Sequence, residues 1–280
     1  MRVLTMVIGE YMSLPRFFIE TPLPDDGEVA LPFNSSELRH INVRRCEVGE
    51  HIACFSEGRR AWEVEITYID NERVTGRIVA PLPIKRLPHL TLVQGISKGD
   101  RMGQTIRQTT ELGIERIIPF LAERSIVRLR KDEGGYKGER WRRIALSAAK
   151  QSGRTILPTV EDPTSIEDIC EELKNFDRVI IAWEEADLDA EGYALSVDKA
   201  LREEPNCDIN SRVALVIGPE GGLSKREVDA FKAVGDQVKV VTLGSLILRT
   251  ETAGTVACAL TMYGLGGLGA QHFDDETPAE

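Results

Sequence analysis

The chain has no long hydrophobic run and few cysteines or histidines, and these absences exclude several classes of protein. No window approaches the ~18 consecutive apolar residues of a membrane span, so we expect no membrane partner. The apolar run Val3–Ile8 is shorter than the hydrophobic region of a secretory signal. Five scattered cysteines, with no Cys-x-x-Cys, are typical of free thiols in a reducing compartment. We therefore expect a cytoplasmic protein.

Two common ligand motifs are missing as well. The four histidines show no His-x-x-x-His or His-Glu-x-x-His spacing, so the sequence indicates no local metal site, although a site assembled from distant residues stays open. The P-loop pattern does not occur. Residues Gly264–Gly269 match G-x-G-x-x-G in their letters, but no strand precedes them and no strand–helix–strand unit follows. We interpret them as a C-terminal turn.

Length, composition and charge favour a soluble enzyme of two domains. The chain has 280 residues, 42% of them hydrophobic and 29% charged. Its net charge of −10 is uneven, because residues 91–158 carry 14 basic and 7 acidic side chains whereas residues 159–280 carry 10 and 25. A basic segment attracts phosphates even in an acidic protein. The alternative is an exposed arginine-rich helix and loop that bind no nucleic acid, and charge alone does not decide between them.

The first third of the chain has the pattern of a small β-barrel. In Trp62–Ile66 apolar and charged residues alternate, as in a strand with one face in solvent. The linker at 80–88 contains three prolines and is unsuited to a helix or a central strand. We predict a barrel domain over residues 12–84 and expect residues 1–11 to be dispensable. The predicted strands are Arg16–Ile19, Glu28–Leu31, His51–Phe55, Trp62–Tyr68 and Arg73–Val79.

From residue 89 to about residue 270, strands and helices alternate, which predicts an α/β domain with a mostly parallel sheet. Two helices are expected to end at glycines, namely Arg101–Leu112 before Gly113 and Glu139–Ser152 before Gly153. A Ser224–Glu227 capping box predicts a third helix that runs to Gly235. The predicted strands are Thr91–Gln94, Ile117–Phe120, Arg178–Trp183, Arg212–Ile217 and Gln237–Leu243.

Two segments that follow predicted strands indicate a ligand site. Gly218–Gly222 comes directly after a strand, where open α/β sheets bind ligands, and its glycines permit close approach of the backbone. Leu243–Ala253 contains the polar cluster Arg249–Thr252 between an apolar run and an apolar helix. The alternatives are a tight turn with nothing bound for the first segment, and for the second a helix N-terminus capped by Thr250 or Thr252.

These segments resemble the 16S ribosomal RNA uridine-N3 methyltransferases, the RsmE family of SPOUT enzymes. The resemblance extends over about Leu14–Tyr263. It is carried by Leu215–Ser224, Leu243-Gly244 and Ile247–Ala253, with support from Lys98–Met102, Thr110–Gly113, Glu123–Ser125 and Gln151–Arg154. It implies an N-terminal PUA-like β-barrel and a C-terminal SPOUT-type α/β domain with a trefoil knot. It also implies a homodimer, S-adenosylmethionine as cofactor and 16S ribosomal RNA, within the small ribosomal subunit, as substrate.

The resemblance also implies roles for individual residues, and it implies no metal ligand. The cofactor would be held by Ile217, Gly218, Pro219, Glu220, Gly221, Gly222, Leu243, Gly244, Ile247, Leu248, Arg249, Thr250, Thr252 and Ala253. The residues expected to contact RNA are Arg16, Arg39, Arg44, Arg45, Lys98, Arg101, Arg124, Arg142, Arg143 and Arg154. Two departures from the family pattern concern this set. Arg39–Arg45 replaces a histidine- and arginine-rich run, and Ser245-Leu246 stands where an arginine often precedes Ile-Leu-Arg.

The chemistry of uridine suggests which residues would be catalytic. N3 carries a proton that must leave before or during attack on a methyl group, and negative charge then develops on the base. Arg249 is our candidate to stabilise that charge, and Glu251 or Glu220 could accept the proton. Either carboxylate could instead orient backbone amides or cap a helix. The rival functions are a non-catalytic RNA-binding protein and a phosphate-handling enzyme that uses Gly218–Gly222 as an anion loop.

Overall fold

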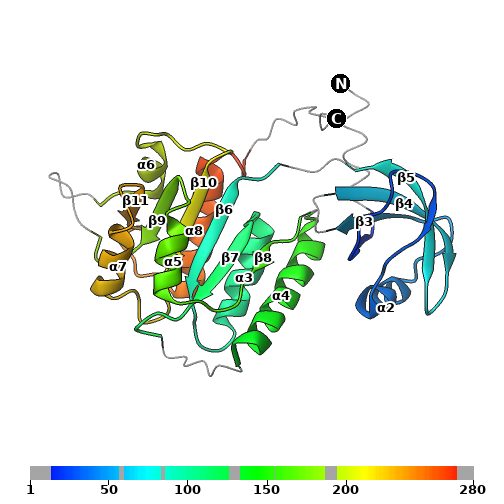
Figure 1. Ribbon diagram of the computed structural model, residues 1–280, viewed down its shortest axis with the longest axis horizontal. Helices are drawn as coiled ribbons and strands as arrows, with labels where there is room; N and C mark the ends of the chain where they lie inside the picture. The colour runs from blue at the N-terminus through cyan, green and yellow to red at the C-terminus, as the bar shows by residue number, and fades with distance from the viewer. Residues whose placement is uncertain are drawn as a thin grey trace. The chain divides into compact units, whose positions relative to one another are not determined.

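The chain forms two compact units in the computed structural model (Figure 1). The structure describes residues 14–56, 60–82, 86–125, 133–154, 156–186 and 194–269. The first unit holds the described residues of 14–82 and 149–157, and the second holds those of 86–148 and 158–269. Residues 1–11 and part of the predicted linker, 83–85, lie outside the described residues.

The first unit is built on one five-stranded sheet, in which all five predicted strands are confirmed with small shifts at their ends. The order across the sheet is β1-β3-β4-β5-β2. β1 and β3 pair in parallel, and the other neighbours are antiparallel. The strands are β1 (Arg16–Phe18), β2 (Glu28–Ala30), β3 (His51–Ser56), β4 (Arg60–Ile69) and β5 (Val74–Pro81).

The first unit also contains a helix that the sequence did not predict, α2 (Ser35–Arg44). The side chain of Asn34 caps it by accepting from the backbone amides of Ser36 and Glu37, each at 3.0 Å. The carboxylate of Glu37 is fully buried and forms an ion pair with Lys150, a residue of segment 149–157. The segment that we expected to contact RNA through Arg39, Arg44 and Arg45 is therefore mostly helical.

The second unit is a six-stranded, wholly parallel sheet in the order β11-β9-β10-β6-β7-β8, and it confirms the predicted α/β pattern. Its strands are β6 (His89–Gly95), β7 (Arg116–Phe120), β8 (Thr159–Val160), β9 (Arg178–Ala182), β10 (Arg212–Ile217) and β11 (Val238–Val241). Its helices are α3 (Arg101–Leu112), α4 (Glu133–Ser152), α5 (Ile166–Leu173), α6 (Val197–Arg202), α7 (Lys225–Lys232) and α8 (Thr250–Gly264), and the last residues of α4 belong to the first unit.

The helix boundaries follow the sequence signals closely. Gly113 and Gly153 adopt positive φ angles of 106° and 75° directly after α3 and α4, as expected of helix-ending glycines. Both hydrogen bonds of the Ser224–Glu227 capping box are present. Two ends differ from the prediction, since α7 ends at Lys232 rather than at Gly235 and α4 begins at Glu133 rather than at 139.

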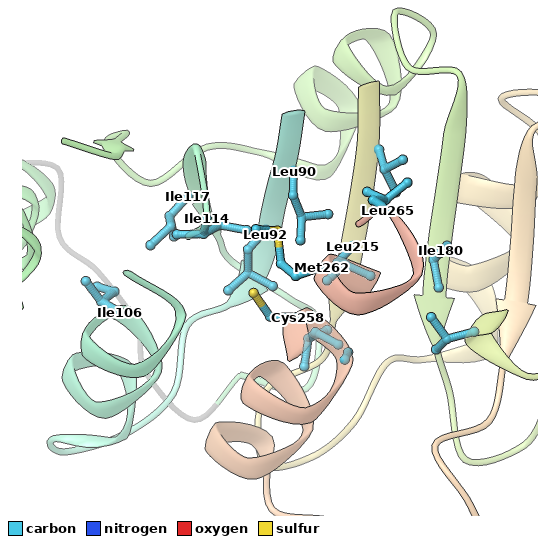
Figure 2. Packing of buried hydrophobic residues seen from close by; sticks show 14 of the residues in the cluster. Leu90, Leu92, Ile106, Ile114, Ile117, Ile180, Leu215, Cys258, Met262 and Leu265 are labelled. Carbon is cyan, nitrogen blue, oxygen red and sulfur yellow. The ribbon is translucent and has the colours of Figure 1, made fainter. Parts of the chain in front are cut away.

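Each face of the parallel sheet is covered by its own hydrophobic core, because successive strand side chains point to opposite faces. On one face, Leu90 and Leu92 of β6 and Leu215 of β10 pack with Cys258 and Met262 of α8 (Figure 2). Alternate residues of the same strands join the second core with α5 and α7. Full burial of such a side chain contributes roughly 1.5–3 kcal/mol, so the two cores hold the strand ends in fixed positions.

The strand order creates a point at which the chain leaves two neighbouring strands in opposite directions. β6 and β10 lie side by side in Figure 1, with Gln94 in register with Ile217. The chain continues from β6 through α3 to β7 on one side, and from β10 through α7 to β11 on the other. The loops after these two strands therefore diverge and open a crevice at the carboxyl edge of the sheet.

Candidate functional site

An open cleft of about 530 Å³ brings together residues from the loop after β6, the start of α3 and the start of α8. Its lining residues are Lys98, Gly99, Asp100, Arg101, Gln104, Arg249 and Glu251. Both predicted catalytic residues, Arg249 and Glu251, thus line one cleft with two basic residues that we expected to bind RNA. The sequence does not show that residues near position 100 and residues near position 250 lie in the same cleft, because they are about 150 positions apart.

The predicted glycine loop, Gly218–Gly222, packs tightly against other backbone. A Cβ atom on Gly218 would lie 2.8 Å from the carbonyl carbon of Gly222, and one on Gly221 would lie 2.8 Å from the carbonyl oxygen of Arg124. Gly222 itself has a positive φ of 69°. At Gly218 and Gly221 the absence of a side chain therefore already serves the fold, whether or not a ligand also approaches the loop.

Glu220 joins the glycine loop to the segment after β6. Its Oε1 accepts hydrogen bonds from the backbone amide of Lys98 at 2.8 Å and from Nη1 of Arg101 at 2.6 Å. Desolvation by burial opposes ionisation, but the hydrogen bonds from its own amide, from Arg101 and from Lys98 outweigh it and lower the pKa of Glu220 below 4.5. Glu220 is therefore a weak base that holds two loops together.

Glu251, like Glu220, has one carboxylate oxygen without a hydrogen bond in the described structure, but no side chain lies within normal hydrogen-bond distance of that oxygen. Its Oε2 has no hydrogen-bond partner among the described residues and lies 3.7 Å from Nε of Arg101. The side chain is 13% exposed and lines the cleft. Arg101 therefore lies between two carboxylates, those of Glu220 and Glu251. This pairing was not apparent from the sequence, and a contact of Arg101 with RNA stays a prediction.

Arg249 is exposed at the start of α8, and its side chain makes no hydrogen bond or ion pair with any residue that the structure describes. It is the N-cap residue of the helix by position, but its side chain does not cap. The segment is a helix N-terminus, as the alternative reading expected, but neither Thr250 nor Thr252 is the cap residue. The hydroxyl of Thr250 instead donates to the carbonyl of Gly218 at 2.6 Å, which joins the two predicted cofactor segments directly.

The other residues of the segment Leu243–Ala253 are mostly exposed to solvent. Ile247 is 91% exposed, Leu246 is 79% exposed, and Thr252 is also exposed. Leu243 and Ala253 pack against the core beneath the cleft. Gly244, with a φ of 121°, has nothing near the position of a Cβ atom. Sequence reasoning missed Gln94 at the end of β6, which is fully buried and donates to Thr250.

The residues expected to contact RNA have different surroundings. Arg39, Arg44, Arg45, Lys98, Arg124 and Arg143 are exposed. Arg142 forms an ion pair with Asp162. Arg154 is buried, with 8% of its surface exposed. Arg16 is partly buried, and desolvation lowers the pKa of its guanidinium. Their contacts with RNA stay predictions.

The described residues include neither a metal-binding cluster nor a membrane-spanning helix. They contain no group of three or more histidine, cysteine, aspartate or glutamate side chains that could hold a metal ion. No helix in this part of the chain has the length and hydropathy needed to span a membrane. The G-x-G-x-x-G match at 264–269 begins at the last residue of α8 and continues in a turn, as expected.

Comparison with known proteins relates both units to RNA methyltransferases. Residues 85–262 match the family model described as an RNA methyltransferase domain, and residues 33–79 match an RNA methyltransferase PUA domain. The chain is 33% identical over 259 residues to ribosomal RNA small subunit methyltransferase E of Bacillus subtilis (strain 168), which covers 89% of this chain and 96% of the relative. The corresponding protein of Aquifex aeolicus (strain VF5) is 31% identical, over 80% of this chain and 90% of the relative.

Solved structures agree with this relationship. The ribosomal RNA small subunit methyltransferase E of Neisseria gonorrhoeae, solved bound to S-adenosyl methionine, has a TM-score of 0.73 and 29% identity, over 89% of this chain and 97% of the other. A putative methyltransferase from Legionella pneumophila, in complex with the bound cofactor SAM, has the same TM-score and 26% identity, with coverage of 89% and 97%. The resemblance seen in the sequence is confirmed, and this chain belongs to the ribosomal RNA small subunit methyltransferase E family.

Proposed function

We propose that this protein is an S-adenosylmethionine-dependent methyltransferase that methylates N3 of a uridine in 16S ribosomal RNA. The observation that carries the proposal is the cleft at the carboxyl edge of the sheet, in which Arg249 and Glu251 lie within the segments that resemble the family's cofactor site. Relatives named for small-subunit ribosomal RNA methylation, and a solved relative bound to S-adenosyl methionine, support it.

The proposal also covers the barrel, the knot, the cellular compartment and the oligomeric state. We propose that residues 12–84 form a PUA-like barrel, that residues 89–270 form a SPOUT domain with a trefoil knot, and that the protein acts in the cytoplasm on the small ribosomal subunit. We further propose a homodimer. Exposed apolar side chains near and within α8 support it, namely Leu246, Ile247, Leu260 and Tyr263.

The cleft is large enough for S-adenosylmethionine, and two residues of the proposed cofactor segments, Arg249 and Glu251, line it. A volume of about 530 Å³ lies within the range of ligand sites, roughly 300–1,000 Å³. Oε2 of Glu251, which accepts no hydrogen bond in the described structure, suits the positive charge or N–H groups of such a ligand. We propose that the cofactor is held by the segments that sequence resemblance singled out, 217–222 with 243–244 and 247–253. When bound, it supplies a methyl group on a positively charged sulfur.

The chemistry assigned to this chain's residues is proton acceptance and charge stabilisation. We propose that Glu251 accepts the N3 proton, because Glu220 has a lowered pKa and its Oε1 already accepts two hydrogen bonds. Arg249 has a free guanidinium in the same cleft and stabilises the negative charge on N3 and its flanking oxygens. A base paired in a duplex cannot present N3, so the substrate is a looped or flipped nucleotide.

The test is incubation of purified protein with radiolabelled S-adenosylmethionine and unmethylated small ribosomal subunits, followed by mapping of the modified base. We expect label on N3 of a single uridine. Binding of the RNA without transfer of label would favour the non-catalytic RNA-binding alternative. Label on another atom or base would contradict the proposed specificity.

A further inference from the structure

A glutamine lies buried in the centre of the parallel sheet, at a place where the neighbouring side chains are apolar. Gln94 is fully buried, one residue before the end of β6, and is in register with Ile217 of β10. A buried amide destabilises a fold unless its polar atoms are hydrogen-bonded. The surroundings of Gln94 therefore have to explain why an amide occupies this position.

Its donor atom reaches two segments that are far away in sequence. Nε2 donates to Oγ1 of Thr250 at 3.0 Å and to the carbonyl of its neighbour Gly95 at 3.1 Å, and it lies 3.4 Å from the carbonyl oxygen of Gly218. Thr250 in turn donates to the same carbonyl of Gly218 at 2.6 Å. The ends of β6 and β10 and the first residue of α8 are thus joined by one buried network.

The direction of each hydrogen bond in this network is fixed. A hydroxyl has one proton, so Thr250, which donates to Gly218, must accept from Gln94. The reverse amide orientation would place an oxygen against two carbonyls. Glycines make room for the arrangement, because a Cβ on Gly254 would lie 2.9 Å from Oε1 of Gln94, and one on Gly95 would lie 2.6 Å from the nitrogen of Pro219.

We propose that Gln94 is a positioning residue for the cofactor site. It acts through Thr250 and Gly218 and fixes the glycine loop of residues 218–222 relative to the start of α8, the two segments that would hold the cofactor. The inference rests on the proposed function for the identity of the ligand. The network itself is a property of the free protein. Without this hydrogen-bond network, the two segments would have to become ordered when the cofactor binds. The entropy cost of that ordering would weaken binding.

The test compares Gln94→Leu, Thr250→Val and the double variant with the unmodified protein. Calorimetry with S-adenosylmethionine should show about a 5- to 10-fold loss of affinity for each single variant, as for loss of one buried hydrogen bond. The double variant should lose little more affinity for S-adenosylmethionine than the weaker-binding single variant loses, because both substitutions break the same network. Thr250→Ser keeps the hydroxyl and should restore affinity. Affinity for RNA should not change.

The matched control is Thr261→Val, which removes a buried hydroxyl from the same helix. Oγ1 of Thr261 has no hydrogen-bond partner in the described part of the chain, so this variant should bind S-adenosylmethionine normally. If Gln94→Leu does not fold, Thr250→Val and Thr250→Ser make the same comparison. Folded variants with unchanged affinity, or effects that simply add in the double variant, would overturn the proposal.

A second measurement separates this proposal from the proposed function. Hydrogen exchange of the amides of 218–222 and of the first turn of α8 is measured without any cofactor, and it should be faster in Thr250→Val than in Thr261→Val. If the unmodified protein binds no S-adenosylmethionine, the proposed function fails, but faster exchange would still support the role of the network. Equal exchange in the two variants would overturn that role.

Discussion

Arg101 and Glu220 form an ion pair, with Nη1 of the arginine 2.6 Å from Oε1 of the glutamate, and the pair connects the first residue of α3 to the glycine loop after β10. The same guanidinium lies 3.7 Å from the carboxylate of Glu251 through its Nε. One arginine thereby lies between a carboxylate whose Oε1 accepts two hydrogen bonds and a carboxylate that it approaches only at 3.7 Å. This arrangement predicts different results for substitution of the two glutamates.

Replacement of Glu220 by glutamine should make the free energy of unfolding less dependent on pH in the acidic range. The pKa of the folded carboxyl lies below its ordinary value of 4.5, so its ionised form stabilises the fold above pH 4.5, and this contribution is lost as the pH falls through the folded pKa. Glu220→Gln should therefore unfold more easily than the unmodified protein at neutral pH, and the difference should vanish in strong acid. Denaturant unfolding at a series of pH values measures this. Glu185→Gln, at an exposed position, is the control, and a difference that stays constant with pH contradicts the prediction.

Removal of the guanidinium of Arg249 should affect the chemical step and not the fold. Arg249 is exposed and makes no hydrogen bond within the described structure, so Arg249→Ala should unfold at the same temperature as the unmodified protein. Its rate of methyl transfer at saturating RNA should fall by roughly 10²–10³-fold, as for loss of one donor to a developing oxyanion. Arg249→Lys should recover little, because an ammonium does not reproduce the planar guanidinium.

Single-turnover kinetics distinguishes a catalytic Arg249 from one that only binds RNA. Arg107→Ala, which removes an exposed arginine of α3 outside the lining of the cleft, is the matched control. A normal chemical rate in Arg249→Ala, with only weaker RNA binding, would show that Arg249 is not catalytic.

Local signals in the sequence predicted the elements well because each depends on a few adjacent residues. Ser224 and Glu227 specify the start of α7 through two hydrogen bonds between residues three apart. Helix α2 was missed because its only buried residues are Glu37 and Ile41, which gives no continuous apolar face for a periodicity argument to detect.

The candidate site was only half predictable, because its contacts join distant parts of the chain. The glycine loop and the Arg249–Thr252 cluster were recognised as polar segments after strands. Gln94 looked like one more strand residue, since its partners Gly218 and Thr250 lie 124 and 156 positions away. For the same reason, sequence indicated that Arg101 is basic but not that it is paired with Glu220 and Glu251. Strand order, which places β10 beside β6, determines all of these contacts.

The buried ion pair of the first unit should be important for stability. Glu37 is fully buried; Lys150, with 17% exposure, pairs with one of its oxygens, and Nδ1 of His40 lies 3.6 Å from the other. Lys150→Met keeps the length of the side chain but removes the lysine charge from a buried carboxylate, which should cost about 3–5 kcal/mol of unfolding free energy. Lys174→Met breaks an exposed pair with Glu171 and should cost about 0–1 kcal/mol. Urea unfolding measures both, and equal effects of the two substitutions would contradict the prediction.

The two neighbouring arginines of α4 should differ in their contribution to RNA binding. Arg142 donates to Asp162 at 2.6 Å and to the carbonyl of Val160 at 3.0 Å, so a phosphate would have to compete with bonds already made. Arg143 is exposed, and its one hydrogen bond in the described structure is a long one of 3.4 Å to a carbonyl of its own helix. Arg143→Ala should therefore weaken RNA binding and reduce the slope of log affinity against log salt by about 1, because one fewer counterion is released.

Arg142→Ala should reduce that slope less. Arg202→Ala removes the same charge outside the basic segment of residues 91–158 and should leave the slope unchanged. Filter binding at a series of salt concentrations makes the comparison, and an equal slope for all three variants would show that this face of α4 does not contact phosphate.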